Sequence, residues 1–294
     1  MNAYHTPVLL HEAVGTLVVK KGNLYVDATL GGGGHTEAIL QRGGIVLGID
    51  QDQSALDFVA ENLKTYIKDG KLTLEKGNFK DIKSISDKHE VRGKVAGILY
   101  DFGVSSFQID KSGKGFSIKR EEPLDMRMGS ETKLNAYDIV NHWNESELAE
   151  IFSRFGEEDY SNEIARAITT RRQFKKIETS LDLATVIKEQ IGRKGGDMHP
   201  ATKAFMALRI VVNDELGAIQ DGLWGGFETL ETNGRMVVIS FHSLEDRITK
   251  KIFQELERAG FAQLVVKKPI VPTEDETHKN RRSRSAKLRA IEKI

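Results

Sequence analysis

Residues 26–40 of the chain read "VDATLGGGGHTEAIL". An apolar segment there runs into four consecutive glycines, residues 31–34, and then into a pattern typical of a helix. Glycine lets backbone N–H groups approach a ligand closely, and the start of a helix carries partial positive charge. The junction therefore predicts a strand, a ligand-binding turn and a helix, in that order.

The segments around this junction continue the alternation of strand and helix. The runs 45–49 and 95–99 are apolar without alternation, which is typical of parallel strands covered by helices on both faces. Helical patterns follow the first two strands at 35–42 and 54–67. We predict strands at 24–30, 44–50, 72–79 and 95–104. The predicted fold class is α/β, with a doubly wound parallel sheet.

A block of helices interrupts this sheet. Asn144 precedes an apolar helical period at residues 148–155, with Glu147 placed to complete a capping box. Two more helices are predicted at 162–172 and 181–191. The pattern of the sheet returns after residue 199, with a helix at 201–216 and a strand in "GRMVVISFHS".

We therefore predict one discontinuous domain, residues 1–112 and 199–294, and an inserted helical domain, residues 113–198. At the end of the chain, "FAQLVVKKPIVP" (261–272) and "AKLRAIEKI" (286–294) predict an antiparallel edge pair. A polar and basic loop joins these two strands.

The glycine turn excludes two common ligand sites. A P-loop needs Lys followed by Ser or Thr after its last glycine, but His35 and Thr36 stand there. A dinucleotide fingerprint starting at Gly31 needs glycine at position 36. Asp27, with Thr29, Gly31 and Gly33, instead matches the loose D-x-G-x-G-x-G signature of S-adenosylmethionine (SAM) methyltransferases, with Thr in place of the first Gly.

Polar or aromatic residues follow the next three strands. Asp50 ends the second strand, where a carboxylate accepts hydrogen bonds from ribose hydroxyls. Asn78 and Phe79 follow the third strand, where an adenine would lie, and Asp101 ends the fourth. Taken singly, each of these residues is better explained structurally, as a turn acid, a core aromatic or a cap. Together they favour a nucleoside ligand, because ligands bind at this edge of such sheets.

Composition limits the partners and the chemistry. Lys plus Arg and Asp plus Glu both total 43, so a nucleic-acid partner has to be argued from local patches. The absence of Cys removes disulfides, thiolate metal sites and cysteine nucleophiles, and the scattered His residues predict no metal site. The sequence has no apolar run near the ~18 residues of a membrane helix and no leader pattern, so a cytoplasmic protein is expected.

Two local clusters are basic. Residues 279–293 hold seven basic residues against Glu292, and the RNA-binding candidates among them are Arg281, Arg282, Arg284 and Lys287. Ser283 and Ser285, interleaved with Arg, favour phosphate binding. The second cluster, at 166–176, fits a solvated helix face and an RNA-binding face equally well.

Two polar stretches have no clear core period. Residues 123–128 contain Asp125 and Arg127, and residues 240–247 contain Ser240, His242, Ser243 and Asp246. They fit the lining of a target pocket. The second stretch fits equally well a helix start capped by Ser243, with Asp246 at the third helical position and His242 packed beneath.

The whole chain resembles the MraW-like family of 16S rRNA (cytosine-N4)-methyltransferases. The resemblance rests on stretches that follow the family order from end to end: "YHTPVLLHE" (4–12), "DATLGGGGHT" (27–36), "DFGVSSFQID" (101–110), "GFSIKREEPLDMRM" (115–128), "HPATKAFMALRIVVNDEL" (199–216), "VISFHSLEDRITK" (238–250) and "RSRSAKLRAIEK" (282–293). The chain departs from the family pattern at Phe102, Phe107 and Lys114, which affects the shape of the site rather than the class.

The resemblance implies a SAM-dependent methyltransferase sheet with an inserted helical, substrate-recognising domain. It implies SAM as the cofactor, held by Gly33, Gly34, His35, Asp50, Phe79, Asp101 and Gln108. The implied partner is 16S rRNA within the small ribosomal subunit, and the reaction is methyl transfer to the exocyclic N4 of a cytidine. Asp101 is the candidate catalytic residue. The oligomeric state stays open, with a homodimer as one option.

Two other classes use the same residues. An NAD-dependent oxidoreductase would use Asp50 and the glycines, but Thr36 breaks its fingerprint. A silent RNA-binding assembly factor would keep the basic clusters and lose SAM binding, and the intact glycine turn argues against it.

Overall fold

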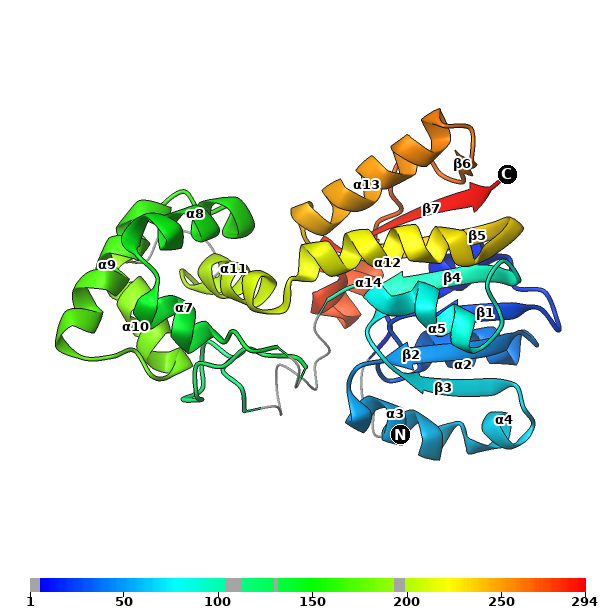
Figure 1. Cartoon of the computed structure of the whole chain (residues 1–294), viewed down its shortest axis with the longest axis horizontal. Helices are drawn as coiled ribbons and strands as arrows, with labels where there is room; N and C mark the ends of the chain where they lie inside the picture. The colour runs from blue at the N-terminus through cyan, green and yellow to red at the C-terminus, as the bar shows by residue number, and fades with distance from the viewer. Residues whose placement is uncertain (1–5, 104–112, 130–131, 193–198) are drawn as a thin grey trace. The chain divides into compact units, whose positions relative to one another are not determined.

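The computed structural model describes residues 6–103, 113–129, 132–192 and 199–294, and divides into two compact units. The first, here called the sheet unit, contains residues 1–103 and 216–294, and the second, the helical unit, contains residues 104–215. Figure 1 labels the elements of both. Each unit has its own hydrophobic core.

The sheet unit is built on seven strands in the order β3-β2-β1-β4-β5-β7-β6. Five of them, β1 to β5, are parallel, and β7 runs antiparallel to both β5 and β6. The strands are β1 (Leu24–Asp27), β2 (Ile45–Asp50), β3 (Leu72–Lys76), β4 (Val95–Asp101), β5 (Leu230–Ser240), β6 (Ala262–Leu264) and β7 (Lys287–Lys293). The doubly wound sheet and the antiparallel pair at its edge are confirmed.

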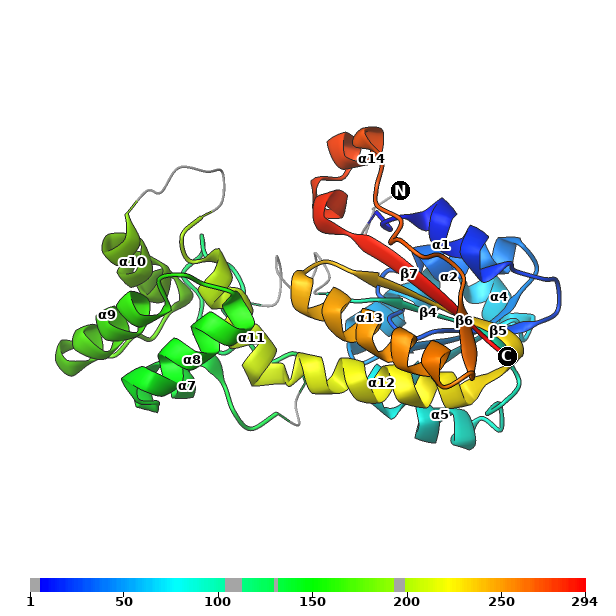
Figure 2. The ribbon, with the colours of Figure 1, turned by 90° about the horizontal axis from the view of Figure 1, so that it is seen from above.

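Helices cover both faces of this sheet, as Figure 2 shows from above. Successive strand residues point to opposite faces, so Tyr25 joins the core beneath one helical layer and Val26 the core beneath the other. One layer is α1 (Leu10–Leu17), α2 (Gly34–Gln41), α3 (Gln53–Asn62) and α4 (Lys64–Lys68). The other is α5 (Ile82–Lys88), α12 (Glu215–Thr229) and α13 (Ser243–Arg258).

Three short elements complete the sheet unit: η1 (Phe79–Asp81), α14 (Glu274–Lys279) and η2 (Arg281–Ser285). The last two form the basic loop, here defined as residues 273–286. Figure 2 shows α14 beside α1.

The glycines of α12 allow this helix to lie close to the sheet. A Cβ at Gly222 would lie 2.7 Å from the Phe79 ring, and one at Gly226 would overlap the Tyr100 hydroxyl. That hydroxyl donates a hydrogen bond to the Gly222 carbonyl at 2.6 Å. The sequence did not predict a helix at 217–229, because glycine is a poor helix former. Close packing against the sheet outweighs that preference.

The helical unit contains α7 (Ala136–His142), α8 (Glu145–Gly156), α9 (Ser161–Phe174), α10 (Ser180–Ile191) and α11 (Thr202–Asn213). The capping box predicted at Asn144 is present: its side chain accepts the Glu147 N–H at 2.9 Å, and the Glu147 carboxylate accepts the Asn144 N–H at 2.8 Å. The buried faces of all five helices share one core.

The boundary of the helical unit differs from the sequence expectation of 113–198. α11 packs its apolar face, including Phe205 and Leu208, into the core of the helical unit. A Cβ at Gly156 of α8 would lie 2.8 Å from the Lys203 carbonyl oxygen, which shows how closely α8 and α11 pack. The single helix predicted at 201–216 is two helices, since Asp214 has a left-handed conformation (φ 46°) between α11 and α12.

Across the described residues, every helix is too short or too polar to cross a lipid bilayer.

Candidate functional site

The direction of the chain connections changes between β1 and β4. After β1 the chain continues to β2, which lies towards one edge of the sheet. After β4 it continues to β5, which lies towards the other edge. In open α/β sheets, ligands bind at such a point, outside the carboxyl ends of the strands. Asp27 ends β1, Asp50 ends β2 and Asp101 ends β4. The sheet therefore brings three carboxyl groups to one edge.

Asp50 fixes the glycine turn. Its Oδ2 accepts the Gly31 N–H at 2.8 Å, and its Oδ1 accepts the Asp52 N–H at 2.9 Å. Burial raises the pKa of Asp50, and these two backbone hydrogen bonds oppose that shift. Each carboxylate oxygen has a second lone pair, so Asp50 retains acceptor capacity for the hydroxyls of a ribose.

The glycines of the turn serve the packing of the chain itself. Gly33 has φ 76°, and a Cβ there would lie 2.9 Å from Val59 Cγ2. A Cβ at Gly34 would lie 2.9 Å from Pro7 Cγ. Gly31 has φ 49°, and a Cβ there would meet only the Thr29 carbonyl oxygen, at 3.9 Å. The predicted close approach of a ligand is therefore available at Gly31, whereas Gly33 and Gly34 have an additional structural reason to be glycine.

Asp27 is almost fully buried, at 1% exposure, beneath the turn. It accepts a hydrogen bond from the Thr36 hydroxyl at 2.7 Å and one from the Thr29 N–H at 3.3 Å. Burial raises the pKa of Asp27 to about 6, against the opposing effect of these bonds. The Thr29 hydroxyl in turn accepts the Asp101 N–H at 2.6 Å, which joins the ends of β1 and β4. The sequence showed Thr29 only as a departure from a glycine signature.

Asp101 lies beside His35. Its Oδ2 is 3.8 Å from His35 Nδ1, and the other ring nitrogen of His35 lies 3.1 Å from the Val8 carbonyl oxygen. Asp101 Oδ1 is buried and has no hydrogen-bond partner among the described residues. Burial, followed by the charges of Asp27 and Glu245, raises the pKa of Asp101 well above its ordinary value. A buried acceptor without a partner is costly, and a ligand that donates a hydrogen bond or carries positive charge would relieve that cost.

Phe79 lies at the end of β3, where the sequence placed an adenine. Its ring packs edge-on to Tyr100 at a centroid distance of 6.0 Å and tilted against Phe102 at 5.5 Å, and it stays partly exposed. Asn78 donates to the Gln51 side chain at 3.3 Å. Phe79 thus supports the core and still presents part of its surface. Gln108 lies outside the described residues.

Comparison with known proteins identifies the class of this site. A family model described as the MraW methylase family matches residues 2–294. The chain belongs to the MraW methylase family. Three relatives bear the name ribosomal RNA small subunit methyltransferase H. The protein of Limosilactobacillus fermentum is 44% identical over 99% of this chain and 98% of its own length. Those of Carboxydothermus hydrogenoformans and Brevibacillus brevis are 44% and 42% identical over 100% of this chain and 99% of their own lengths.

The chain is thus a methyltransferase, and its cofactor is SAM. The residues at the sheet edge fit this group. SAM carries a sulfonium and an ammonium, and the edge offers the carboxyl groups of Asp27, Asp50 and Asp101. One oxygen of Asp101 is buried without a hydrogen-bond partner in the described part of the chain.

The basic loop of this MraW-family chain lies at the same edge of the sheet. β7 begins at Lys287, which pairs with Ser240 at the carboxyl end of β5. Arg281, Arg282 and Arg284 are exposed on η2, whereas the Ser283 side chain is buried and donates to the Asn280 carbonyl. Ser283 is therefore not available to bind phosphate, contrary to the sequence expectation.

Three other cations of the predicted cluster, Lys287, Arg289 and Lys293, contact the fold itself. Arg289 makes two hydrogen bonds to Asp246, at 2.6 and 3.1 Å, and Lys287 lies 3.5 Å from the same carboxylate. Burial alone would raise the pKa of Asp246, but the two neighbouring cations outweigh that effect and lower the pKa. Lys293 donates to the carbonyls of Phe227 and Leu230. Among the four RNA-binding candidates, the exposed arginines are thus better placed for RNA than Lys287.

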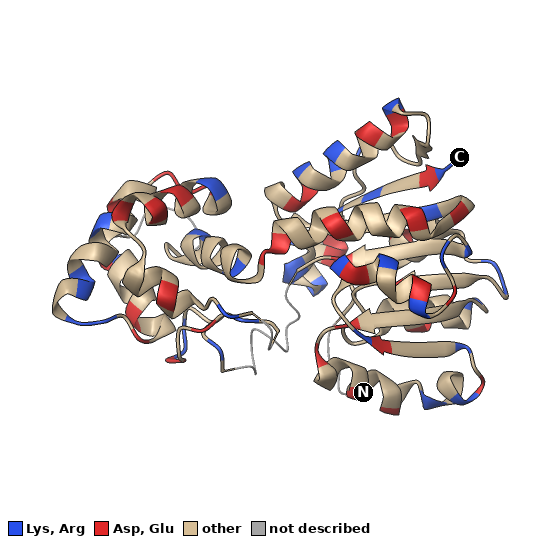
Figure 3. Cartoon of the chain, in the orientation of Figure 1, with Lys and Arg blue, Asp and Glu red and all other residues tan. Residues whose placement is uncertain are grey.

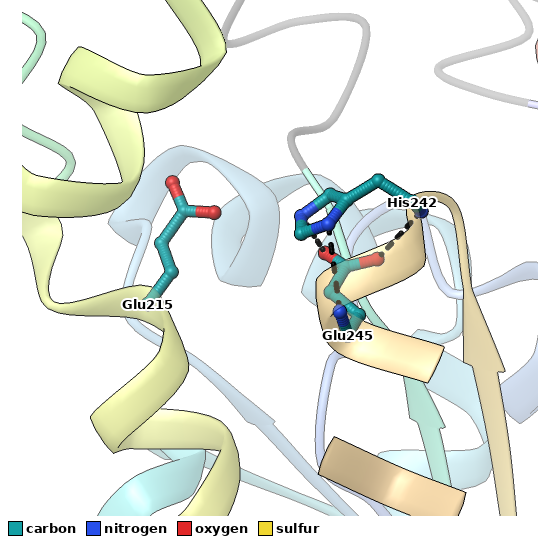
Figure 4. A group of neighbouring side chains, drawn as sticks. All are labelled: Glu215, His242 and Glu245. Atoms are coloured by element: carbon teal, nitrogen blue, oxygen red, sulfur yellow. Dashed lines mark hydrogen bonds and ion pairs between the residues drawn. The ribbon is translucent and has the colours of Figure 1, made fainter. Parts of the chain in front are cut away.

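The start of α13 differs from the expected cap. Helix α13 begins at Ser243, and His242 is its N-cap, so the assignment of Ser243 as the cap was wrong. His242 Nδ1 accepts the Glu245 N–H at 3.4 Å, while Glu245 Oε2 accepts the N–H groups of Phe241 and His242. Figure 4 shows the His242 ring beside the Glu245 carboxylate, with Nε2 and Oε1 3.0 Å apart. His242 Nε2 has no hydrogen-bond partner among the described residues, and its contact with Oε1 is an ion pair only when the ring is protonated.

The amino-terminal segment connects the basic loop to the glycine turn. Glu276 of α14 accepts the Leu9 N–H at 2.8 Å, and Asn280 donates to the Thr6 carbonyl at 3.3 Å. Pro7 packs on Gly34, and Val8 contacts His35 through its carbonyl. The sequence offered no sign of the role of Glu276, because the contact joins opposite ends of the chain.

In the helical unit, Arg127 makes a two-pronged pair with Asp125, through Nε to Oδ1 at 2.8 Å and Nη2 to Oδ2 at 2.7 Å. The Arg127 hydrogen bond lowers the pKa of Asp125. Asp125 and Arg127, which the sequence suggested as lining of a target pocket, thus neutralise each other's charge.

Proposed function

We propose that the chain transfers the methyl group of SAM to the exocyclic N4 of a cytidine in 16S rRNA of the small ribosomal subunit. The observation that carries the proposal is the identity of 42–44%, over nearly the full length of both chains, to proteins named ribosomal RNA small subunit methyltransferase H. The sheet edge described above supplies the matching chemistry. An enzyme that methylates ribosomal RNA would act in the cytoplasm.

Transfer to nitrogen suits this chain better than transfer to cytosine C5. Methylation at C5 normally requires a cysteine that adds covalently to the ring, and the sequence contains no Cys. Bound SAM supplies a methyl group already activated on a sulfonium. The task of the protein is then mainly to align the amine with it.

Asp101 is the proposed catalytic residue. The N4 amine is a poor nucleophile because its lone pair is delocalised into the ring, and a hydrogen-bond acceptor close to the amine would localise that pair. Asp101 Oδ1 is a buried acceptor at the end of β4 with no partner among the described residues. Burial raises the pKa of Asp101 well above its ordinary value, which makes its carboxylate a stronger proton acceptor. His35 and the Thr29 hydroxyl position Asp101 from either side.

We assign the residues that contact SAM from their positions at the carboxyl ends of the strands. Asp50 would accept from the ribose, Phe79 would pack on the adenine, and the turn at Gly33, Gly34 and His35 would border the remainder of SAM. Arg281, Arg282 and Arg284 on the basic loop would hold RNA phosphates at the same edge. The helical unit is proposed to recognise the RNA around the target, with the cytidine turned out of its surroundings.

The proposal is tested by incubating the protein with methyl-labelled SAM and small subunits that lack the modification. The 16S rRNA is then digested enzymatically to nucleosides, which are separated. Label in N4-methylcytidine supports transfer to N4, whereas label in 5-methylcytidine or in a ribose-methylated nucleoside contradicts it. Measurable SAM binding without label in RNA would indicate another substrate, and no SAM binding would indicate a silent assembly factor.

A further inference from the structure

Helix α9 of the helical unit has one apolar face and one strongly basic face. Ile164, Ala165 and Ile168 are buried in the core of the unit. The basic residues of the helix and of the segment after it are Arg166, Arg171, Arg172, Lys175 and Lys176, and no acidic residue lies between positions 164 and 177. Figure 3 shows these cations in blue along α9 and the segment that follows it.

Two of these cations are engaged by the fold. Arg166 Nε lies 3.4 Å from a Glu145 carboxylate oxygen, and Arg172 donates to the Val140 carbonyl at 2.7 Å. Within the described ranges, no acidic side chain pairs with Arg171, Lys175 or Lys176, and all three are exposed. Their positive charge is thus left for a partner.

An aromatic ring stands among these cations. Phe174, the last residue of α9, is 85% exposed, more than any other large apolar side chain that the structure describes. Phe261 follows it among the phenylalanines at 60%. Full exposure of a phenyl ring gives no benefit to the folded chain itself, since burying apolar surface is what stabilises it.

The fold holds this ring in place. Arg172 fastens the last turn of α9 to α7 through Val140. Three residues after Phe174, the buried Ile177 exchanges two hydrogen bonds with the Asn141 side chain, at 3.0 and 2.8 Å. The chain is therefore anchored on both sides of Phe174, and the exposure of the ring is not the result of a frayed helix end.

We propose that Arg171, Phe174, Lys175 and Lys176, here called the α9 stacking surface, bind a single-stranded segment of the RNA substrate, with an unpaired base stacked on Phe174. Rings stack on unpaired bases of any sequence, and flanking cations neutralise the phosphates on either side. This inference rests on the proposed function and adds to it a place in the helical unit where the RNA is held.

The composition of the surface favours RNA over a protein partner. Stable protein interfaces have an apolar centre in which Lys is depleted, and they bury far more surface than one ring provides. Three cations around one aromatic ring instead match the combination of charge and stacking used for single strands. A second copy of the chain would also bring the same positive charge against this surface.

The test compares three variants of the full chain by fluorescence anisotropy with a short labelled single-stranded RNA. Phe174→Leu keeps an apolar side chain but removes the ring, and we expect it to weaken binding about tenfold. Phe174→Tyr keeps the ring and should bind like the unchanged protein. Phe261→Leu is the matched control at an exposed phenylalanine outside the surface. Since Phe174 is exposed, the Tm should not change in any of the Phe174 variants.

Salt dependence separates stacking from charge. Lys175→Ala should lower the slope of log Kd against log salt by about 0.7, as expected for one phosphate contact on a single strand, whereas Phe174→Leu should leave the slope unchanged. Equal weakening by Phe174→Leu and Phe261→Leu, or a change within about twofold in Phe174→Leu, would overturn the proposal. Loss of self-association in Phe174→Leu with unchanged RNA binding would also overturn it, in favour of a dimer surface.

Methylation kinetics relate this surface to the reaction. With small subunits as substrate, Phe174→Leu should raise KM for the subunit and leave kcat and KM for SAM unchanged. The anisotropy measurement needs no methyl transfer, so the expected binding pattern without any methylated product would contradict the proposed function while supporting the surface.

Discussion

Asp101 Oδ2 lies 3.8 Å from His35 Nδ1 at the carboxyl end of β4, while the second oxygen of the same carboxyl group is buried without a partner among the described residues. The cost of this arrangement is balanced only when a donor or a cation reaches the second oxygen. A cationic ligand bound at this edge of the sheet would therefore favour the charged form of Asp101.

The first prediction concerns the pH dependence of SAM binding. The pKa of Asp101 is raised by burial and by the nearby charges of Asp27 and Glu245. A cationic ligand favours the ionised carboxylate, so SAM should bind more weakly as the pH falls through the Asp101 pKa, by up to about tenfold per pH unit. Calorimetry across a pH series measures this slope.

Asp101→Asn removes that titration and should flatten the slope, although Asp27 and Asp50 still titrate nearby. Asp69→Asn, at the exposed residue that follows α4, is the control and should keep the full slope. The same pH dependence in Asp101→Asn as in the unchanged protein would count against a role for this carboxyl group.

The second prediction concerns the stability of the fold. Burial raises the pKa of Asp27 from 3.8 to about 6. The protonated form is favoured in the folded chain, so its contribution is fully present below pH 3.8 and is lost as the pH rises through 6. The loss amounts to about 3 kcal/mol of the free energy of unfolding.

Urea unfolding of the unchanged protein and of Asp27→Asn tests this directly. The difference in the free energy of unfolding between the two should shift in favour of the variant as the pH rises from about 4 to about 6.5. A difference that stays constant over this range would show that Asp27 does not titrate as described.

The third prediction concerns the contact between the two ends of the chain. Glu276→Ala leaves the Leu9 N–H without its acceptor and loosens the segment that touches Gly34 and His35. We expect KM for SAM to rise about fivefold, corresponding to the loss of one hydrogen bond. Glu276→Gln keeps an acceptor oxygen and should restore KM.

Glu274→Ala, two residues earlier at an exposed position of α14, is the matched control. If it raises KM for SAM as much as Glu276→Ala does, the effect belongs to α14 in general and not to the Leu9 contact.

The fourth prediction separates the two kinds of cation near β7. Arg284 is exposed, whereas Arg289 is paired with the largely buried Asp246. Arg284→Ala should weaken RNA binding and lower its salt slope by about 0.7–0.9 at constant Tm. Arg289→Ala should lower the free energy of unfolding by about 2–3 kcal/mol, because Asp246 loses its main partner. Equal Tm values for the two variants would contradict this division of roles.

The parts of the fold that could be predicted were those encoded locally. Strands buried on both faces show as apolar runs, so β2 and β4 were found, and the Asn144 capping box fixed the start of α8. Helix α12 was missed because its glycines act through close packing on Tyr100, which local propensity does not contain. The assignment of α11 failed for a similar reason: an amphipathic helix does not reveal which core it joins.

The same distinction holds for the site. The acids at the strand ends were predicted because parallel strands all end at one edge. The partners of the cations were not, since spacing alone cannot show that Arg289 pairs with Asp246 while Arg284 stays exposed. Glu276 was missed because 267 positions separate it from Leu9.

We propose above all that this chain, with SAM bound at the carboxyl ends of its parallel strands, transfers a methyl group to cytidine N4. The most direct measurement is mass spectrometry of nucleosides from 16S rRNA, after reaction of small subunits lacking the modification with isotope-labelled SAM. We expect labelled N4-methylcytidine with the unchanged protein and with Asp69→Asn, and its loss with Asp50→Ala. Label in another nucleoside, or N4-methylcytidine formed at an undiminished rate by Asp50→Ala, would contradict it.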